Sequence, residues 1–135
     1  MDIKINTNTV IAVVEDDESI LDAVSIILES KGWDVRAYST GEAFLDATRS
    51  SSKENSRKPR SPDFLILDPH LPGINGDEVL EQLAEYIDRG DIHIIILTAH
   101  PNGPKTLALH DMGVDDVLLK PVTQETLIHS ISKYL

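Results

Sequence analysis

The stretch FLILDPHLPGING, from Phe64 to Gly76, places four apolar residues directly before an aspartate and then a loop with two prolines and two glycines. Such an apolar run, bounded by turn residues, predicts a buried β-strand over Phe64–Leu67. An ionised carboxylate beside a protein interior needs a cation or hydrogen bonds to be stable. The position of Asp68 at the very end of this strand therefore predicts a carboxylate that is kept for function.

Outward from this strand, short apolar runs alternate with amphipathic helical patterns along the chain. The expected strands are Val10–Val14, Asp34–Tyr38, Phe64–Leu67, Ile92–Leu97 and Asp115–Leu119. The expected helices are Ser19–Lys31, Gly41–Arg49, Gly76–Ile87, Pro104–Met112 and Thr123–Leu135. Asp17 is expected to cap the first helix, and Asn75 followed by Glu78 is a typical start for the third. The alternation predicts an α/β fold with a parallel sheet covered by helices on both faces.

The length of 135 residues predicts a single domain, with its core over about residues 10–135 and no output domain in the chain. The polar segment SSSKENSRKPRSP, residues 50–62, lacks periodicity and is expected to be an extended surface loop. A docking element in this segment is the alternative interpretation.

The composition limits the classes of function. A net charge of −11 and a pI of about 4.7 disfavour binding to phosphate backbones, so no direct nucleic-acid binding is expected. The absence of cysteine excludes disulfides, thiolate metal sites and a cysteine nucleophile. No apolar run approaches the ~20 residues of a membrane helix, and the chain begins without the apolar core of a signal peptide. We therefore expect a cytoplasmic protein without membrane contact.

The polar residues that follow the expected strands form one constellation. Ligands of open parallel sheets bind at the carboxyl ends of the strands. That edge receives Glu15, Asp16 and Asp17 after the first strand, Asp68 after the third, Thr98 and Ala99 after the fourth, and Lys120 and Pro121 after the fifth. Each alone has a structural explanation, because acidic pairs often cap helices and a lone threonine or Lys-Pro pair carries little information. Their joint arrival at one edge favours a functional site.

The residue types at this edge suit phosphoryl transfer. Crowded carboxylates repel one another, and a hard cation such as Mg²⁺ relieves that repulsion. Lys120 is expected to partner the carboxylates or a transferred phosphoryl group, and Thr98 to hydrogen-bond a phosphoryl oxygen. Asp68, placed centrally, is expected to be the nucleophile that becomes an acyl phosphate in an in-line transfer.

The chain resembles the receiver domain of two-component response regulators from Val10 to its C-terminus. The motifs that carry the resemblance are VVEDDE (Val13–Glu18), LILDPHLPGING (Leu65–Gly76), ILTAH (Ile96–His100) and LLKP (Leu118–Pro121). The resemblance implies a five-stranded, doubly wound, flavodoxin-like fold with strand order 2-1-3-4-5. It also implies a cis peptide bond before Pro121.

The resemblance assigns a role to each matching residue. Asp68 matches the phospho-acceptor, while Thr98, Ala99 and Lys120 match the phosphoryl-binding and switch positions. The implied metal is Mg²⁺, with Mn²⁺ as the alternative. Its implied ligands are Glu15, Asp16, Asp68 and the backbone carbonyl of His70. His70 and His100 sit at offsets that flank the path of hydrolytic water in the family, so they are expected to tune phosphoryl lifetime.

The implied function is a phosphorylation-dependent signalling switch rather than an enzyme with a separate substrate, although the chain would assist its own phosphorylation and dephosphorylation. The expected donor is a phosphohistidine on a sensor histidine kinase or a histidine phosphotransfer protein. The expected kinase-docking residues are Glu18, Asp22 and Ser25 on the first helix. The output surface would comprise the fourth strand, fourth helix, fifth strand and fifth helix. It would act on a downstream effector domain or protein, or form a homodimer on phosphorylation.

Three residues depart from the pattern of the family. Val117 stands where receivers often carry the aromatic residue of the threonine–aromatic switch, and Val122 stands where a phenylalanine often follows Lys-Pro. Pro69 follows the acceptor directly and removes one backbone donor beside the site. A degenerate receiver that acts as a phosphorylation-independent interaction module is therefore the alternative function.

Other classes fit the sequence poorly. Haloacid dehalogenase phosphatases need a second aspartate two residues after the nucleophile, where this chain has His70, and no cap domain is present. A nucleotide- or flavin-binding module needs a glycine-rich loop after the first strand, where this chain has an acidic triplet. A transition-metal site built from His70, His100 and the acids is a minor further alternative.

Overall fold

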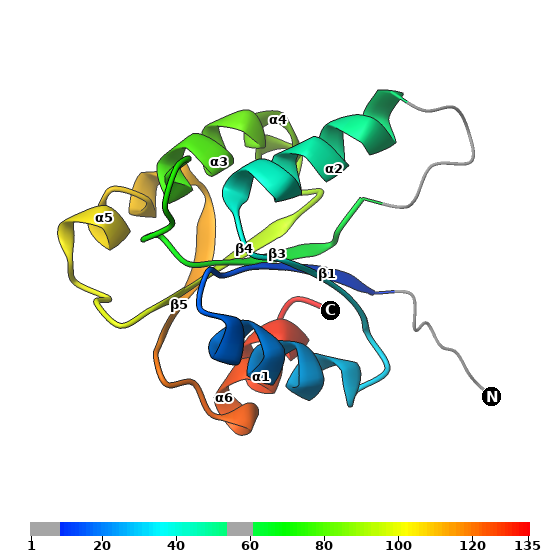
Figure 1. The fold of residues 1–135 in the computed structure, drawn as a ribbon, viewed down its shortest axis with the longest axis vertical. Helices are drawn as coiled ribbons and strands as arrows, with labels where there is room; N and C mark the ends of the chain where they lie inside the picture. The colour runs from blue at the N-terminus through cyan, green and yellow to red at the C-terminus, as the bar shows by residue number, and fades with distance from the viewer. Residues whose placement is uncertain (1–8, 54–60) are drawn as a thin grey trace.

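The computed structural model describes residues 9–53 and 61–135. Its centre is a parallel five-stranded sheet in the order β2-β1-β3-β4-β5, with helices on both faces (Figure 1). The strands are β1 (Val10–Val14), β2 (Asp34–Tyr38), β3 (Phe64–Leu67), β4 (His93–Thr98) and β5 (Val114–Leu119). The predicted α/β class and strand order are confirmed, and predicted strand limits differ from these by at most one residue.

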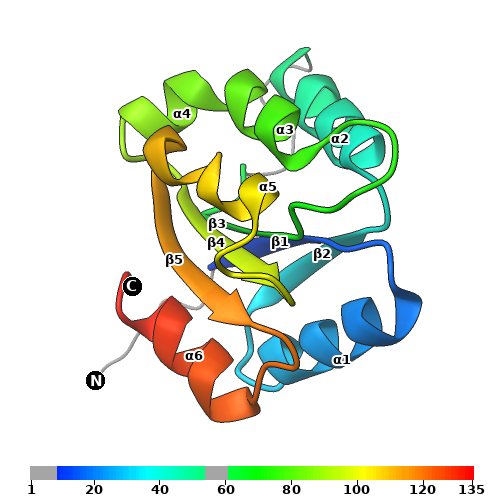
Figure 2. The ribbon, with the colours of Figure 1, turned by 90° about the vertical axis from the view of Figure 1, so that its left-hand side faces the viewer.

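Helices of unequal length form the two outer layers. They are α1 (Glu18–Glu29), α2 (Gly41–Lys53), α3 (Gly76–Gln82), α4 (Ala84–Asp88), α5 (Pro104–Leu107) and α6 (Gln124–Ser132), with a 3₁₀ turn at His110–Met112. Helices α1 and α6 cover one face of the sheet, and α2 to α5 cover the other (Figure 2). This arrangement follows from right-handed crossovers between parallel strands.

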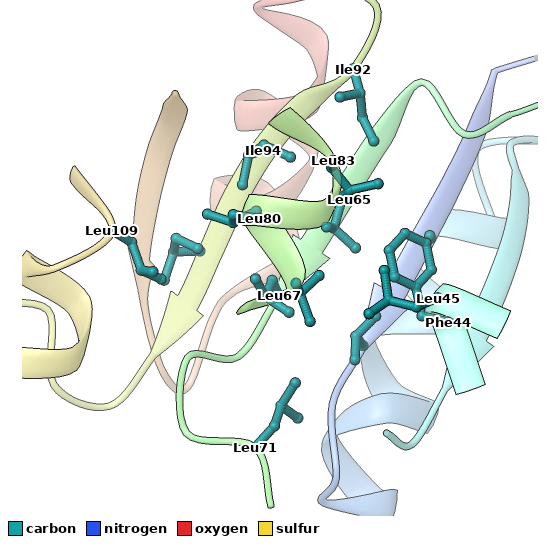
Figure 3. Close-up of a cluster of buried hydrophobic side chains, with 14 residues drawn as sticks. Phe44, Leu45, Leu65, Leu67, Leu71, Leu80, Leu83, Ile92, Ile94 and Leu109 are labelled. Atoms are coloured by element: carbon teal, nitrogen blue, oxygen red, sulfur yellow. The ribbon is translucent and has the colours of Figure 1, made fainter. Parts of the chain in front are cut away.

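The central strands are apolar on both faces because successive side chains point in opposite directions. In β3, Leu65 and Leu67 pack under the α2–α5 layer, where Phe44 and Leu80 are also buried (Figure 3). The alternate residues Phe64 and Ile66 pack against α1 and α6. Strand β3 therefore contributes to both cores, and packing on its two faces positions its end.

The expected loop over residues 50–62 is wrong at its start, because α2 continues to Lys53. Once a helix has formed, each added residue costs little, so a polar sequence can extend it without an apolar partner. Residues 54–60 of the expected loop lie outside the described residues. Ser61 and Pro62, at its end, are neither helix nor strand, as predicted.

Two predicted helices are interrupted. The expected helix Gly76–Ile87 breaks at Leu83, whose N–H bonds to the Leu80 carbonyl three residues back and whose side chain is buried. Tertiary burial here overrides local helix propensity. The expected helix Pro104–Met112 becomes α5 and a 3₁₀ turn that ends at Gly113, which has a φ of 87°.

The predicted helix starts and the cis bond are confirmed. Asp17 accepts a hydrogen bond from the Ile20 N–H at 3.1 Å, and the Asn75 N–H donates to Glu78 Oε1 at 3.1 Å. The Lys120–Pro121 peptide bond is cis. The first of these caps fixes the chain immediately after Glu15 and Asp16, which belong to the candidate site.

Helix α6 is fastened to β5 through Asp116. Its Oδ2 accepts hydrogen bonds from the buried Ser130 hydroxyl at 2.7 Å and from Lys133 Nζ at 3.0 Å. Burial alone would raise the pKa of Asp116, but the bonds from Ser130 and Lys133 outweigh it and lower the pKa below its ordinary value of 3.8.

We expect Asp116→Ala to lower the free energy of unfolding by about 1–3 kcal/mol, because the buried Ser130 hydroxyl loses its acceptor. A group with a lowered pKa stabilises the fold above its unfolded pKa and loses that effect as pH falls through the folded value. The difference in unfolding free energy between Asp116→Ala and the wild type should therefore become smaller at acid pH. Urea unfolding at several pH values measures it, with the exposed Asp111→Ala as a neutral control. An equal deficit at all pH values would contradict this account.

Candidate functional site

The predicted constellation meets at the carboxyl edge of the sheet. Glu15 follows β1 and is 2% exposed, and Asp68 follows β3 and is 7% exposed. Thr98 ends β4 and is also buried. The backbone N–H of Lys120, the residue after β5, donates to the Thr98 carbonyl at 2.8 Å, so the ends of β4 and β5 are bound together. Asp16 is exposed at the rim.

Lys120 joins the two buried carboxylates. Its Nζ lies 2.7 Å from Glu15 Oε1 and 3.0 Å from Asp68 Oδ2. Burial alone would lower the pKa of Lys120, but the hydrogen bonds to Glu15 and Asp68 more than compensate and raise it. The ammonium is therefore a permanent cation between two acids that face the same edge.

Glu15 is the acid of this site whose pKa is shifted. Burial raises its pKa above the ordinary 4.5, and the nearby charge of Asp68 adds to the rise. The bond from Lys120 and the Asp17 N–H, which donates to Glu15 Oε2 at 2.9 Å, act in the opposite direction. Additional positive charge at this edge would favour the ionised form of Glu15.

The donor set at this edge fits a hard divalent cation. Glu15, Asp16 and Asp68 each present a carboxylate oxygen, and these oxygens lie within 4.8 Å of one another. Mg²⁺ uses one or two carboxylates and keeps several waters, and the exposure of Asp16 leaves space for water. Among the described residues this is the one such group of acids and histidines, and it contains neither His70 nor His100. The geometry therefore favours a hard cation such as Mg²⁺ over a transition-metal site built with His70 and His100.

Two loop turns beside Asp68 have the same construction. Asp68 Oδ1 accepts the His70 N–H at 2.8 Å, and Thr98 Oγ1 accepts the His100 N–H at 2.9 Å. The rings of His70 and His100 stack with centroids 5.5 Å apart and an angle of 21° between their planes. The sequence placed both histidines near the site, but it contained no signal that their rings would meet.

The turn after β4 is anchored from α5. The buried Thr106 hydroxyl donates to the His100 carbonyl at 2.8 Å, and the Gly103 N–H donates to the same oxygen at 3.0 Å. Ala99 is exposed within this turn. The role of Thr106 was missed by sequence analysis, because a threonine inside a short helical pattern gives no indication of a loop contact.

An apolar hollow of about 510 Å³ opens beside Lys120, between α1 and the start of α6. Its lining includes Ser19, Ile20, Ala23, Ile27, Pro121 and Val122. The predicted docking residues Glu18, Asp22 and Ser25 lie on the same helix but outside this lining.

Comparison with known proteins identifies the family of this fold and site. The family described as "Response regulator receiver domain" matches residues 11–132. The chain therefore belongs to the receiver domains of two-component response regulators.

Individual relatives agree with this membership. The DNA-binding response regulator MtrA of Mycolicibacterium paratuberculosis is 31% identical over 118 residues, which cover 87% of this chain and 47% of MtrA. A receiver protein from Burkholderia phymatum superposes with a TM-score of 0.77 at 29% identity, covering 94% of each chain. The BeF3-activated receiver domain of DrrB from Thermotoga maritima gives 0.75 at 28% identity, covering 94% of this chain and 97% of that domain.

The chain spans about half the length of the curated relatives it matches. Within residues 9–53 and 61–135, none of the helices combines the length and apolar character that a membrane crossing requires.

We expect Mg²⁺ to raise the melting temperature of the wild-type protein, because an ion that binds only the folded state stabilises it. The gain is about 2.7 kcal/mol when the ion is at a hundredfold excess over its Kd. Asp16→Asn should remove most of the gain, since it removes one hard oxygen charge from the rim, whereas Asp22→Asn on exposed α1 should keep it. Thermal unfolding with and without Mg²⁺ measures this. Equal stabilisation of all three proteins would exclude Asp16 as a ligand.

Proposed function

We propose that this receiver domain is a phosphorylation-dependent switch that accepts a phosphoryl group on Asp68 in a Mg²⁺-dependent reaction. The observation that carries the proposal is the placement of Asp68, which is buried at the end of β3 with Lys120 Nζ at 3.0 Å. The acids Glu15 and Asp16 stand beside it. The chain acts as a regulator that assists its own reaction rather than as an enzyme with a separate substrate.

The residues divide the work of transfer between them. A carboxylate oxygen of Asp68 attacks the phosphorus of a phosphohistidine donor, the P–N bond breaks, and the imidazole nitrogen leaves with its electron pair. Lys120, the Thr98 hydroxyl and the backbone N–H groups of Ala99 and His70 neutralise charge on the phosphoryl oxygens. Mg²⁺, or Mn²⁺ in its place, would be held by Glu15, Asp16, Asp68 and the His70 carbonyl and would supply further charge neutralisation.

Pro69 reduces the number of backbone N–H groups that can bind the phosphoryl group. A proline has no N–H, so the residue after the acceptor cannot donate to the phosphoryl group. His70 supplies the first backbone donor after Asp68, and its N–H is already directed at the Asp68 carboxylate. In this proposal, phosphoryl lifetime depends on fewer donors and on the rings of His70 and His100, whose backbone N–H groups bind Asp68 and Thr98.

We infer that the donor is a sensor histidine kinase or a histidine phosphotransfer protein and that it docks in the apolar hollow between α1 and the loop that follows β5. Ile20, Ala23 and Pro121 give that surface an apolar centre next to Lys120. The downstream partner is an effector domain or protein, reached through β4, α5, β5 and α6, with homodimerisation as a second output. The acidic charge argues against direct nucleic-acid binding by this domain, and the setting we propose is the cytoplasm.

Intact-mass measurement after incubation with phosphoramidate and Mg²⁺ tests the proposal. We expect one phosphate adduct per chain, and none when a chelator removes the metal. A folded protein that takes no phosphate would favour the alternative, a degenerate receiver that acts as an interaction module without phosphorylation. Val117 in place of an aromatic switch residue and Pro69 directly after the acceptor are the features that favour this alternative.

A further inference from the structure

The stacked rings of His70 and His100 connect the two functional oxygens of the site. The backbone N–H of His70 binds Asp68 Oδ1, and the backbone N–H of His100 binds Thr98 Oγ1. The imidazole rings of His70 and His100 stack with their centroids 5.5 Å apart, so the two loops are also in contact through their side chains. A movement of either oxygen that keeps its hydrogen bond therefore also moves a histidine backbone and the stacked ring that it carries.

The contact is buried on one side and accessible on the other. The Nε2 atom of His70 is buried and has no hydrogen-bond partner among the described residues, and the ring that carries it stacks on that of His100. His100 itself is exposed. Its carbonyl is held by the Thr106 hydroxyl of α5 and by the Gly103 N–H, so a shift of His100 is transmitted to α5.

Val117 occupies the position where receivers often carry the aromatic switch residue. It is half-buried and packs against the core that includes Leu109, and it has no aromatic ring that could turn inward. A change at Thr98 therefore has no aromatic ring on β5 to displace. The path through His100 to Thr106 is built from direct hydrogen bonds.

We propose that the His70–His100 stack is a latch that holds the unphosphorylated arrangement of the two loops and that must rearrange when Thr98 and Asp68 engage a phosphoryl group. The inference rests on the proposed function, and it adds the element that couples the site to α5. The latch makes phosphorylation less favourable than it would be without the stack. The latch also couples the phosphorylation of Asp68 to the position of the exposed His100 ring.

A double-mutant cycle on the affinity for beryllofluoride, a phosphoryl mimic, tests the latch. Calorimetric titration with Mg²⁺ present would compare wild type, His70→Ala, His100→Ala and the double variant. Because an aromatic pair contributes about 0.5–1.5 kcal/mol, each single change should raise the affinity about two- to tenfold. The double variant should gain no more than the larger single gain, since one contact is lost only once.

Two control variants separate the stack from other effects of removing a histidine. His100→Phe keeps an aromatic ring and should stay near the wild-type affinity. His110→Ala removes an exposed histidine of the 3₁₀ turn and should leave the affinity unchanged. Unchanged affinity in both single variants, or single effects that multiply in the double variant, would overturn the latch alone. A wild-type protein that binds no beryllofluoride would overturn the proposed function as well.

Discussion

Asp68→Asn should take up no phosphate from phosphoramidate and Mg²⁺ under conditions that give the wild-type protein one adduct per chain. The amide has nearly the shape of the carboxylate, but it has neither the charge nor the nucleophilic oxygen needed to form an acyl phosphate. The fold should survive, because Asp68 lies after the last residue of β3 and its backbone N–H still donates to the Val14 carbonyl.

The matched control for this change is Asp77→Asn, which neutralises an exposed aspartate in the first turn of α3. This variant should be phosphorylated like the wild type. Intact mass compares the three proteins side by side, and circular dichroism checks that each is folded. A phosphate adduct on folded Asp68→Asn would show that another residue accepts the group.

Lys120→Met should lower the free energy of unfolding by about 3 kcal/mol at neutral pH, because the change leaves two buried carboxylates without their cation. This loss of stability is at the lower end of what breaking a buried ion pair costs, because the Lys120 side chain is still 16% exposed to solvent. Methionine preserves most of the apolar stem, so the loss reports the charge rather than packing. Phosphorylation should fall as well, since the phosphoryl oxygens lose their ammonium partner.

The pH dependence of this deficit has a definite sign. Burial already raises the pKa of Glu15, and loss of Lys120 removes a group that opposes the rise. An acid with a raised pKa stabilises the fold at low pH and loses that contribution as pH rises through its folded pKa. The variant should therefore approach the wild-type stability in mild acid and fall furthest behind it at neutral pH. Mg²⁺ should recover part of the loss.

Urea unfolding of Lys120→Met across this pH range, with and without Mg²⁺, measures both effects. Lys105→Met, at an exposed position on α5, removes a lysine that pairs with no buried acid among the described residues, and it should change stability little. A Lys120→Met deficit that grows toward acid pH would mean that the ammonium does not compensate buried carboxylates.

The site residues that the sequence predicted are those that directly follow or end a β-strand. Four apolar residues before Asp68 identify a buried strand, and parallel strands deliver their last residues to one edge, so Glu15, Thr98 and Lys120 follow by the same reasoning. The family resemblance added the strand order and the cis bond before Pro121, both of which the structure bears out.

The parts that the sequence did not predict depend on tertiary contacts. Leu83 breaks a regular helical pattern because its side chain is buried against the sheet, and no local signal marks that position. The bonds of Lys120 to both Glu15 and Asp68, and the stacking of two histidines thirty residues apart, arise only when separate loops meet. Periodicity reports which face of an element is apolar, but it carries no information on such pairings.

The most direct test of the central claim is to locate the phosphoryl group by chemical trapping. The protein would be phosphorylated with phosphoramidate and Mg²⁺ and reduced with borohydride, which converts an aspartyl phosphate to homoserine and leaves a free carboxylate unchanged. Peptide sequencing by mass spectrometry then reads the modified position. Homoserine at position 68, absent when metal is chelated, is the predicted result. Homoserine at another position, or at none in a folded protein, would contradict the assignment of Asp68 as the phospho-acceptor.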